Sequence, residues 1–151
     1  MQIASYVRAG GTPSYGIVLG DAVIDLGPRL GGRFPTLRAV LAADALAEVA
    51  AIAQAAKPDL RLSEVTLLPP IPDPAKIVCV GRNYRGHAAE SGVALPEHPM
   101  LFLRLVNTLV AHGGALVRPR QSGDFDFEGE LAVIIGKGGR HIQPAAALGH
   151  V

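Results

Sequence analysis

Apolar and acidic side chains alternate along residues 124–135. The odd-numbered positions are apolar or glycine, and the first four even-numbered positions are carboxylates: Asp124, Asp126, Glu128 and Glu130. Because successive side chains of a strand point to opposite faces, the alternation predicts one β-strand with an apolar face and an acidic face. The acidic face becomes apolar at Ala132 and Ile134, which indicates that it runs toward a core. Two interpretations remain open: a solvent-exposed acidic face, or a divalent cation held by Glu128 and Glu130.

The first 68 residues have the pattern of a small α/β domain. Short apolar runs separated by glycine-containing turns predict an antiparallel meander, at residues 3–7, 15–19 and 22–26. A segment rich in glycine and proline predicts a loop at residues 27–35. Good helix formers then predict two helices, at residues 36–42 and 45–56, the second capped by Asp44. Two further short strands are expected at residues 60–62 and 65–68.

A proline-dense connector follows. The prolines within residues 69–74 exclude both regular helix and strand, so we expect a boundary between a small N-terminal domain at 1–68 and a second domain at 69–151. In the second domain the pattern predicts a buried strand, a short helix and another strand, at residues 76–80, 85–90 and 100–104. A brief strand pairing at 116–117 is expected, as is a helix that begins at Pro144 with Gln143 in a capping position.

Composition narrows the functional classes. The chain of 151 residues is 49% hydrophobic and 18% charged, which is typical of a globular protein. A net charge of +1 and 5% aromatic residues argue against nucleic acid and anionic membranes as partners. The N-terminus lacks a signal-peptide pattern, and no uncharged apolar run reaches the roughly 18 residues of a membrane span, so a cytoplasmic location is expected. Cys79 lies in an apolar run and is expected to be a small buried hydrophobic residue.

Three groups of residues carry candidate chemistry. Glu128 and Glu130 offer hard oxygen ligands, which suit Mg²⁺, Mn²⁺ or Ca²⁺. On a helix, His87 and Glu90 share a face, so they form either a general base with the carboxylate that orients it or an ordinary surface pair. Arg104 ends an apolar strand and is either a clamp for a substrate carboxylate or a surface side chain with a buried stem.

Taken together, these segments resemble the fumarylacetoacetate hydrolase family. The resemblance is carried by residues 76–90, which contain Gly81-Arg82-Asn83-Tyr84 and the His87/Glu90 pair, and by residues 101–104, 108–110 and 126–136, the last of which contains Glu128-Gly129-Glu130. It extends from about residue 69 to 151, and residues 1–68 resemble the small N-terminal domain of many bacterial members.

The resemblance implies an α+β, mostly β, protein in which residues 69–151 form the first part of a mixed β-sandwich or β-roll. It implies a Mg²⁺ or Mn²⁺ ion on Glu128 and Glu130, with His87 and Glu90 as the dyad that activates water or moves a proton. Arg104 falls where many members have a lysine near the substrate carboxylate, and Arg82 and Tyr84 are further candidates for substrate binding. The expected substrates are 2-oxo and 1,3-dicarbonyl acids, which members hydrolyse, isomerise or decarboxylate, and the full-length form is expected to be a homodimer.

Two departures from the family pattern matter. Residues 105–107 replace a segment that commonly contains proline, and the third metal ligand of the family, an Asp beyond the acidic strand, is missing because the chain stops at Val151. We therefore expect the N-terminal half of a longer protein. The alternatives are a catalytically inactive truncated remnant and a small-ligand-binding module of the same fold.

Overall fold

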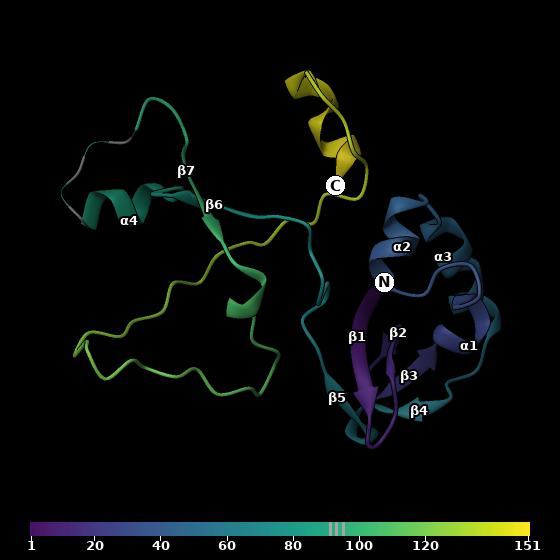
Figure 1. Cartoon of the computed structure of the whole chain (residues 1–151). Helices are drawn as coiled ribbons and strands as arrows, with labels where there is room; N and C mark the ends of the chain where they lie inside the picture. The colour runs from purple at the N-terminus through teal and green to yellow at the C-terminus, as the bar shows by residue number, and fades with distance from the viewer. Residues whose placement is uncertain (91, 93, 95) are drawn as a thin grey trace. The chain divides into compact units, whose positions relative to one another are not determined.

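The structure is a computed structural model that describes residues 1–90, 92, 94 and 96–151. It divides into two compact units, one of Met1–Ile71 with Val110–Val151 and one of Pro72–Leu109. Figure 1 shows the helices and strands of both units along the colour-coded chain. Each unit is described by itself below.

The first unit contains a five-stranded antiparallel sheet. Its order is β4-β3-β2-β1-β5, formed by β1 (Gln2–Arg8), β2 (Pro13–Leu19), β3 (Ala22–Asp25), β4 (Leu60–Arg61) and β5 (Val65–Leu67). The first three strands form the predicted meander, with Ile3 opposite Ile17 and Ile17 opposite Ile24. The turn between β2 and β3 contains Gly20 with a positive φ of 62°, a conformation that glycine adopts without a steric penalty. The meander and the two short strands that follow it are therefore confirmed.

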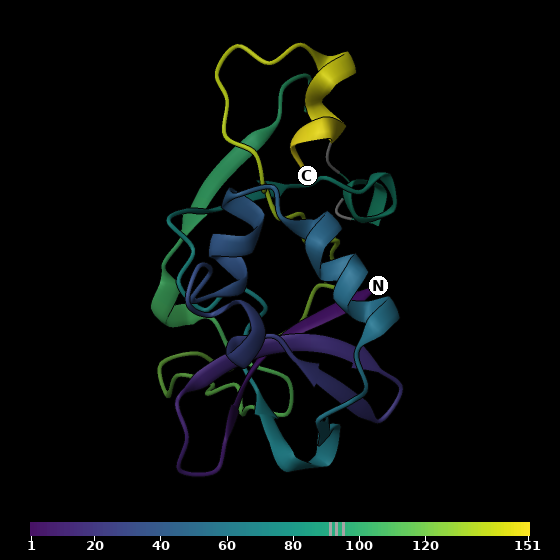
Figure 2. The same cartoon turned by 90° about the vertical axis from the view of Figure 1, so that its right-hand side faces the viewer.

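Helices gather on one side of this sheet (Figure 2). α2 (Leu37–Ala42) begins after Thr36, whose hydroxyl accepts a hydrogen bond from the Ala39 N–H at 3.2 Å, and α3 is Leu46–Ala55. The two predicted helices are confirmed. Apolar side chains from these two helices, from the sheet and from residues 26–30 form one buried core: Tyr15, Ile17, Ile24, Leu26, Leu30, Leu37, Val40 and Val49. Among the described helices, none combines the length and the apolar character that a membrane crossing requires.

Two local predictions within Met1–Ile71 are wrong. The expected loop at 27–35 contains a one-turn helix, α1 (Gly27–Leu30), because Pro28 lies in its first turn, where no helical N–H bond is lost. Asp44 does not cap α3. The N-cap residue is Ala45, which makes no side-chain capping bond, and Asp44 adopts a left-handed conformation with φ 53° just before it.

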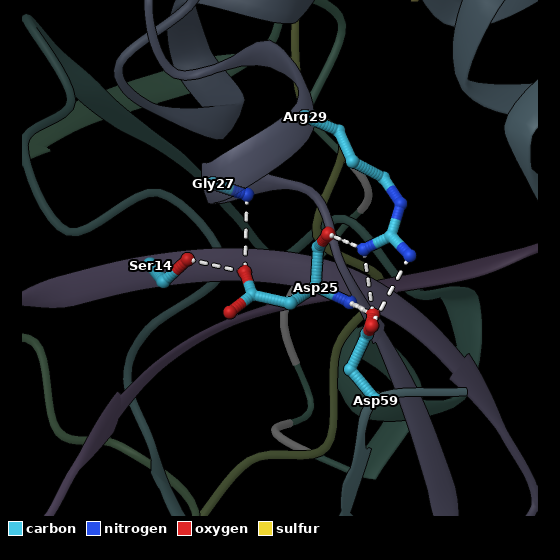
Figure 3. A network of polar contacts seen from close by, with 5 residues as sticks. All are labelled: Ser14, Asp25, Gly27, Arg29 and Asp59. Atoms are coloured by element: carbon cyan, nitrogen blue, oxygen red, sulfur yellow. Dashed lines mark hydrogen bonds and ion pairs between the residues drawn. The ribbon is translucent and has the colours of Figure 1, made fainter. Parts of the chain in front are cut away.

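A polar network fixes the end of β3 (Figure 3). The Asp25 carboxylate accepts hydrogen bonds from the Ser14 hydroxyl at 2.7 Å and from the Gly27 N–H at 3.0 Å. The Asp25 N–H donates to the Asp59 carboxylate at 2.8 Å, and Arg29 binds Asp59 through both guanidinium nitrogens at 2.6 and 3.1 Å. The network thus joins β2, β3, α1 and the segment before β4.

This network predicts acid sensitivity. The hydrogen bond from Arg29 lowers the pKa of Asp59 below its ordinary value. A depressed folded-state pKa stabilises the fold above the unfolded-state pKa of about 4, and this stabilisation is lost as the pH falls through the folded-state value. Because the Arg29 and Asp59 side chains are 30% and 35% exposed, we expect a loss of at most about 1 kcal/mol. Urea unfolding at pH 5 and pH 3 measures this loss as a difference between the two free energies of unfolding. In the Asp59→Asn variant this difference should be smaller. An equal difference in both proteins would contradict the assignment.

The second unit is built on a two-stranded antiparallel sheet. β6 (Ile77–Gly81) pairs with β7 (Met100–Arg104), and α4 (Arg85–Glu90) lies between them in the sequence. All three elements form where the sequence predicts them, but β6 is not the buried strand that was expected, because none of its side chains is buried and Val78 is 52% exposed. The Ser91-Gly92 pair predicts the end of the helix, and Ser91 lies outside the described residues. Cys79 is half-buried rather than buried. Every side chain of β7 is exposed, so the sandwich implied by the resemblance is not assembled within this unit.

Residues 110–151 contain no β-strand. Between the short 3-10 helices η2 (Val106–Thr108) and η3 (Pro144–His150), no helix or strand forms, so the strands predicted at 116–117 and 124–135 are wrong. Phe127 and Leu131 are 87% and 81% exposed. A strand is stabilised by hydrogen bonds to a neighbour, and the described chain offers this segment no pairing partner. The predicted helix at Pro144 is a 3-10 helix, and the Gln143 side chain makes no capping bond.

Candidate functional site

The loop and helix after β6 carry four of the candidate residues. Arg82 follows the strand directly and adopts a left-handed backbone conformation with φ 54°. The Tyr84 carbonyl accepts a hydrogen bond from the Ala88 N–H at 3.1 Å, which closes the first turn of α4. Ala88 is 1% exposed and anchors the helix, whereas His87 and Glu90 are exposed. The structure therefore presents His87 and Glu90, three residues apart on one helix, to solvent.

The pairing of β6 with β7 separates the two candidate arginines of this unit. Gly81 lies opposite Met100, and Ile77 lies opposite Arg104. Arg82 therefore follows the end of β6 that faces Met100, and Arg104 lies at the other end of the ribbon. Four residues of strand correspond to roughly 13 Å. The structure brings Arg82 and Tyr84 to the start of α4 and does not bring Arg104 to the same end.

Glu128 and Glu130 lie in the irregular segment before η3, and both are exposed. Their carboxylates have the chemistry that a hard divalent cation prefers. Within the part of the chain that is described, however, no group of three or more His, Cys, Asp or Glu side chains could hold a metal ion. Two carboxylates alone are an incomplete donor set, so the residues of this chain do not fit a complete metal site, and no catalytic step through a metal follows from this structure.

The polar network of the N-terminal unit was not foreseen from the sequence. Asp25 and Asp59 are separated by 34 positions, and no local spacing signals their contact. Burial raises the pKa of Tyr6 well above its ordinary value, and the nearby Asp25 carboxylate raises it further. We assign this network to stability, because it joins backbone segments and lies outside the segments that carry the candidate chemistry.

The second half of the chain matches a known protein family. Residues 76–151 match the model of the fumarylacetoacetate (FAA) hydrolase C-terminal family. The matched residues are half of the chain and include all the candidate site residues: Arg82, Tyr84, His87, Glu90, Arg104, Glu128 and Glu130.

Curated proteins and a solved structure extend the match. The chain is 45% identical over 94 residues to the mitochondrial oxaloacetate tautomerase FAHD2A of Homo sapiens, covering 62% of this chain and 30% of that protein. It is 47% identical over 94 residues to the oxaloacetate tautomerase YisK of Bacillus subtilis (strain 168), covering 60% and 31%. The crystal structure of an HpcE-like protein from Mycobacterium smegmatis is 29% identical with a TM-score of 0.51, covering 70% of this chain and 36% of that one. The chain therefore spans about a third of the length of these proteins.

Proposed function

Because the chain belongs to the fumarylacetoacetate hydrolase family, we propose that the whole protein interconverts the keto and enol forms of oxaloacetate or of a closely related 2-oxo acid. The observation that carries the proposal is the family match over residues 76–151, which contains the His87/Glu90 pair and both glutamates. The names of the human and Bacillus relatives favour tautomerisation over the hydrolytic and decarboxylating reactions of the family.

Tautomerisation needs a group that moves a proton between C3 and the enol oxygen. In the proposal His87 is that group, since a neutral imidazole accepts a proton and its conjugate acid returns it. Glu90, one helical turn away, would accept the other ring N–H and fix the tautomer. Exposure of both side chains leaves them accessible to a substrate.

We also propose a divalent cation, Mg²⁺ or Mn²⁺, as the cofactor. When bound, such a cation would stabilise negative charge on the 2-oxo oxygen. Glu128 and Glu130 would supply two of its ligands, and the remaining ligands must come from water, substrate or residues outside these 151.

The first test is a direct tautomerase assay. We expect the whole protein, supplied with Mg²⁺ or Mn²⁺, to accelerate loss of the ultraviolet absorbance of enol-oxaloacetate above the spontaneous rate. Acylpyruvate cleavage and oxaloacetate decarboxylation are followed in parallel. Cleavage without tautomerisation would replace the proposed reaction, and no acceleration of any of the three would favour the inactive remnant or the binding module.

A further inference from the structure

Arg82 occupies a backbone conformation that its side chain does not favour. Its φ of 54° lies in the left-handed region, where glycine, asparagine and aspartate are the common residues. Asp44 shares this conformation and has a short polar side chain that tolerates it. The side chain of Arg82 is long and gives no such tolerance. A strained residue between a strand and a helix that carries candidate chemistry suggests a functional constraint on that position.

The guanidinium of Arg82 has no strong partner in the described part of the chain. Its Nη1 lies 4.0 Å from the Met100 sulfur, which is a weak acceptor. The ion pairs of Arg29 with Asp59 and of Arg33 with Glu48 do not involve it. Arg82 is also exposed. Its charge and its planar set of donors are therefore available for a ligand.

The position of Arg82 along the chain places it near the proposed proton-transfer group. It directly precedes the Asn83-Tyr84 step into α4, and His87 follows on that helix. Arg104, the other candidate for a carboxylate, pairs with Ile77 at the far end of the β6–β7 ribbon. Of these two arginines, Arg82 is the one that the structure holds at the end of the ribbon where α4 begins.

We propose that the Arg82 guanidinium binds the substrate carboxylate that is remote from the 2-oxo group, and that the site thereby selects dicarboxylic over monocarboxylic 2-oxo acids. This inference rests on the proposed function. Oxaloacetate carries a second carboxylate on the carbon that loses the proton, and this charge must be compensated when it leaves water. A guanidinium binds a carboxylate through two parallel hydrogen bonds, which provides both charge and orientation.

The test compares two enols with wild-type and variant whole protein: enol-oxaloacetate, with two carboxylates, and enol-phenylpyruvate, with one. In Arg82→Asn, which removes the charge but tolerates the left-handed backbone, we expect the KM for oxaloacetate to rise roughly 10- to 100-fold. The preference for oxaloacetate over phenylpyruvate should fall by a similar factor. Arg82→Lys should recover part of the preference, because it keeps the charge and loses the bidentate geometry.

Arg85→Asn is the matched control, since it removes the same charge from the adjacent helix and should leave the preference within about twofold. A preference that is unchanged in Arg82→Asn, or that falls in Arg104→Gln instead, overturns the inference and leaves the proposed function intact. A wild-type protein that tautomerises neither enol overturns the proposed function and this inference with it. Circular dichroism of each variant verifies that α4 and the sheet are retained.

Discussion

Replacing His87 with alanine should lower kcat for oxaloacetate tautomerisation roughly 10²- to 10⁴-fold, the usual contribution of a positioned general base. KM should change little, because the imidazole is proposed to move a proton rather than to hold a carboxylate. The helix should survive, since His87 is exposed and alanine is the strongest helix former. Steady-state kinetics of the whole protein, with thermal unfolding to verify folding, measures the effect.

Glu90→Gln provides the companion variant. It keeps the size and helix propensity of the side chain but removes the charge that would orient the imidazole, so we expect a smaller loss of kcat than in His87→Ala. The double variant should lose no more than His87→Ala alone, because the two residues would act as one unit. Activity that survives His87→Ala would remove the dyad from the mechanism and direct attention to other proton carriers of the protein.

Local sequence signals predicted most helices and strands of residues 1–71 well. The meander of β1, β2 and β3 follows from short apolar runs joined by glycine-containing turns, and each of its strands pairs with a sequence neighbour. α2 begins one residue after the predicted start, because Thr36 is its N-cap and accepts a hydrogen bond from a residue only three positions away. The predicted cap of α3 is an exception. Asp44 has the residue type of a cap but the wrong backbone conformation, and conformation is not readable from type alone.

Features that depend on distant residues were not predictable. Asp25 and Asp59 meet through a fold that places the segment after α3 beside β3, and no periodicity encodes this contact. The alternation at 124–135 predicted a strand, yet alternation only makes a strand possible. Partner backbone is needed to satisfy its hydrogen bonds, and the described residues supply none. The chain spans about a third of the length of the human and Bacillus relatives.

In the candidate site, too, the local elements were predictable from the sequence and the contacts between distant residues were not. The sequence located the helix with His87 and Glu90 at the residues where α4 forms, because a short helix is a local structure. It also singled out Glu128 and Glu130, but whether they meet His87 depends on contacts that no local pattern specifies. The separation of Arg82 from Arg104 required the register of β6 against β7, which only the structure provides.

Adding Mg²⁺ should raise the melting temperature of the whole protein, and this rise should disappear in a Glu128→Gln/Glu130→Gln variant. A ligand that binds only the folded state stabilises it by about 2.7 kcal/mol at a concentration of 100 times its Kd. Since 1 kcal/mol shifts the melting temperature of a domain of about 150–250 residues by about 2–4 °C, we expect a shift of several degrees. Two glutamines keep the size of the side chains but remove the charges that bind a hard cation. The loss should therefore appear in the Mg²⁺ response rather than in the metal-free melting temperature.

Asp126→Asn is the matched control, because Asp126 lies next to the pair on the alternating segment and is proposed to take no part in the site. It should leave the Mg²⁺ response unchanged. The 151-residue chain alone should respond little, since its described residues assemble no group of three metal ligands. A response of the short chain equal to that of the whole protein would show that two carboxylates suffice, and a whole protein that ignores both Mg²⁺ and Mn²⁺ would remove the metal from the mechanism. Comparing the Mg²⁺ response of the 151-residue chain with that of the whole protein therefore distinguishes an incomplete metal site from an absent one.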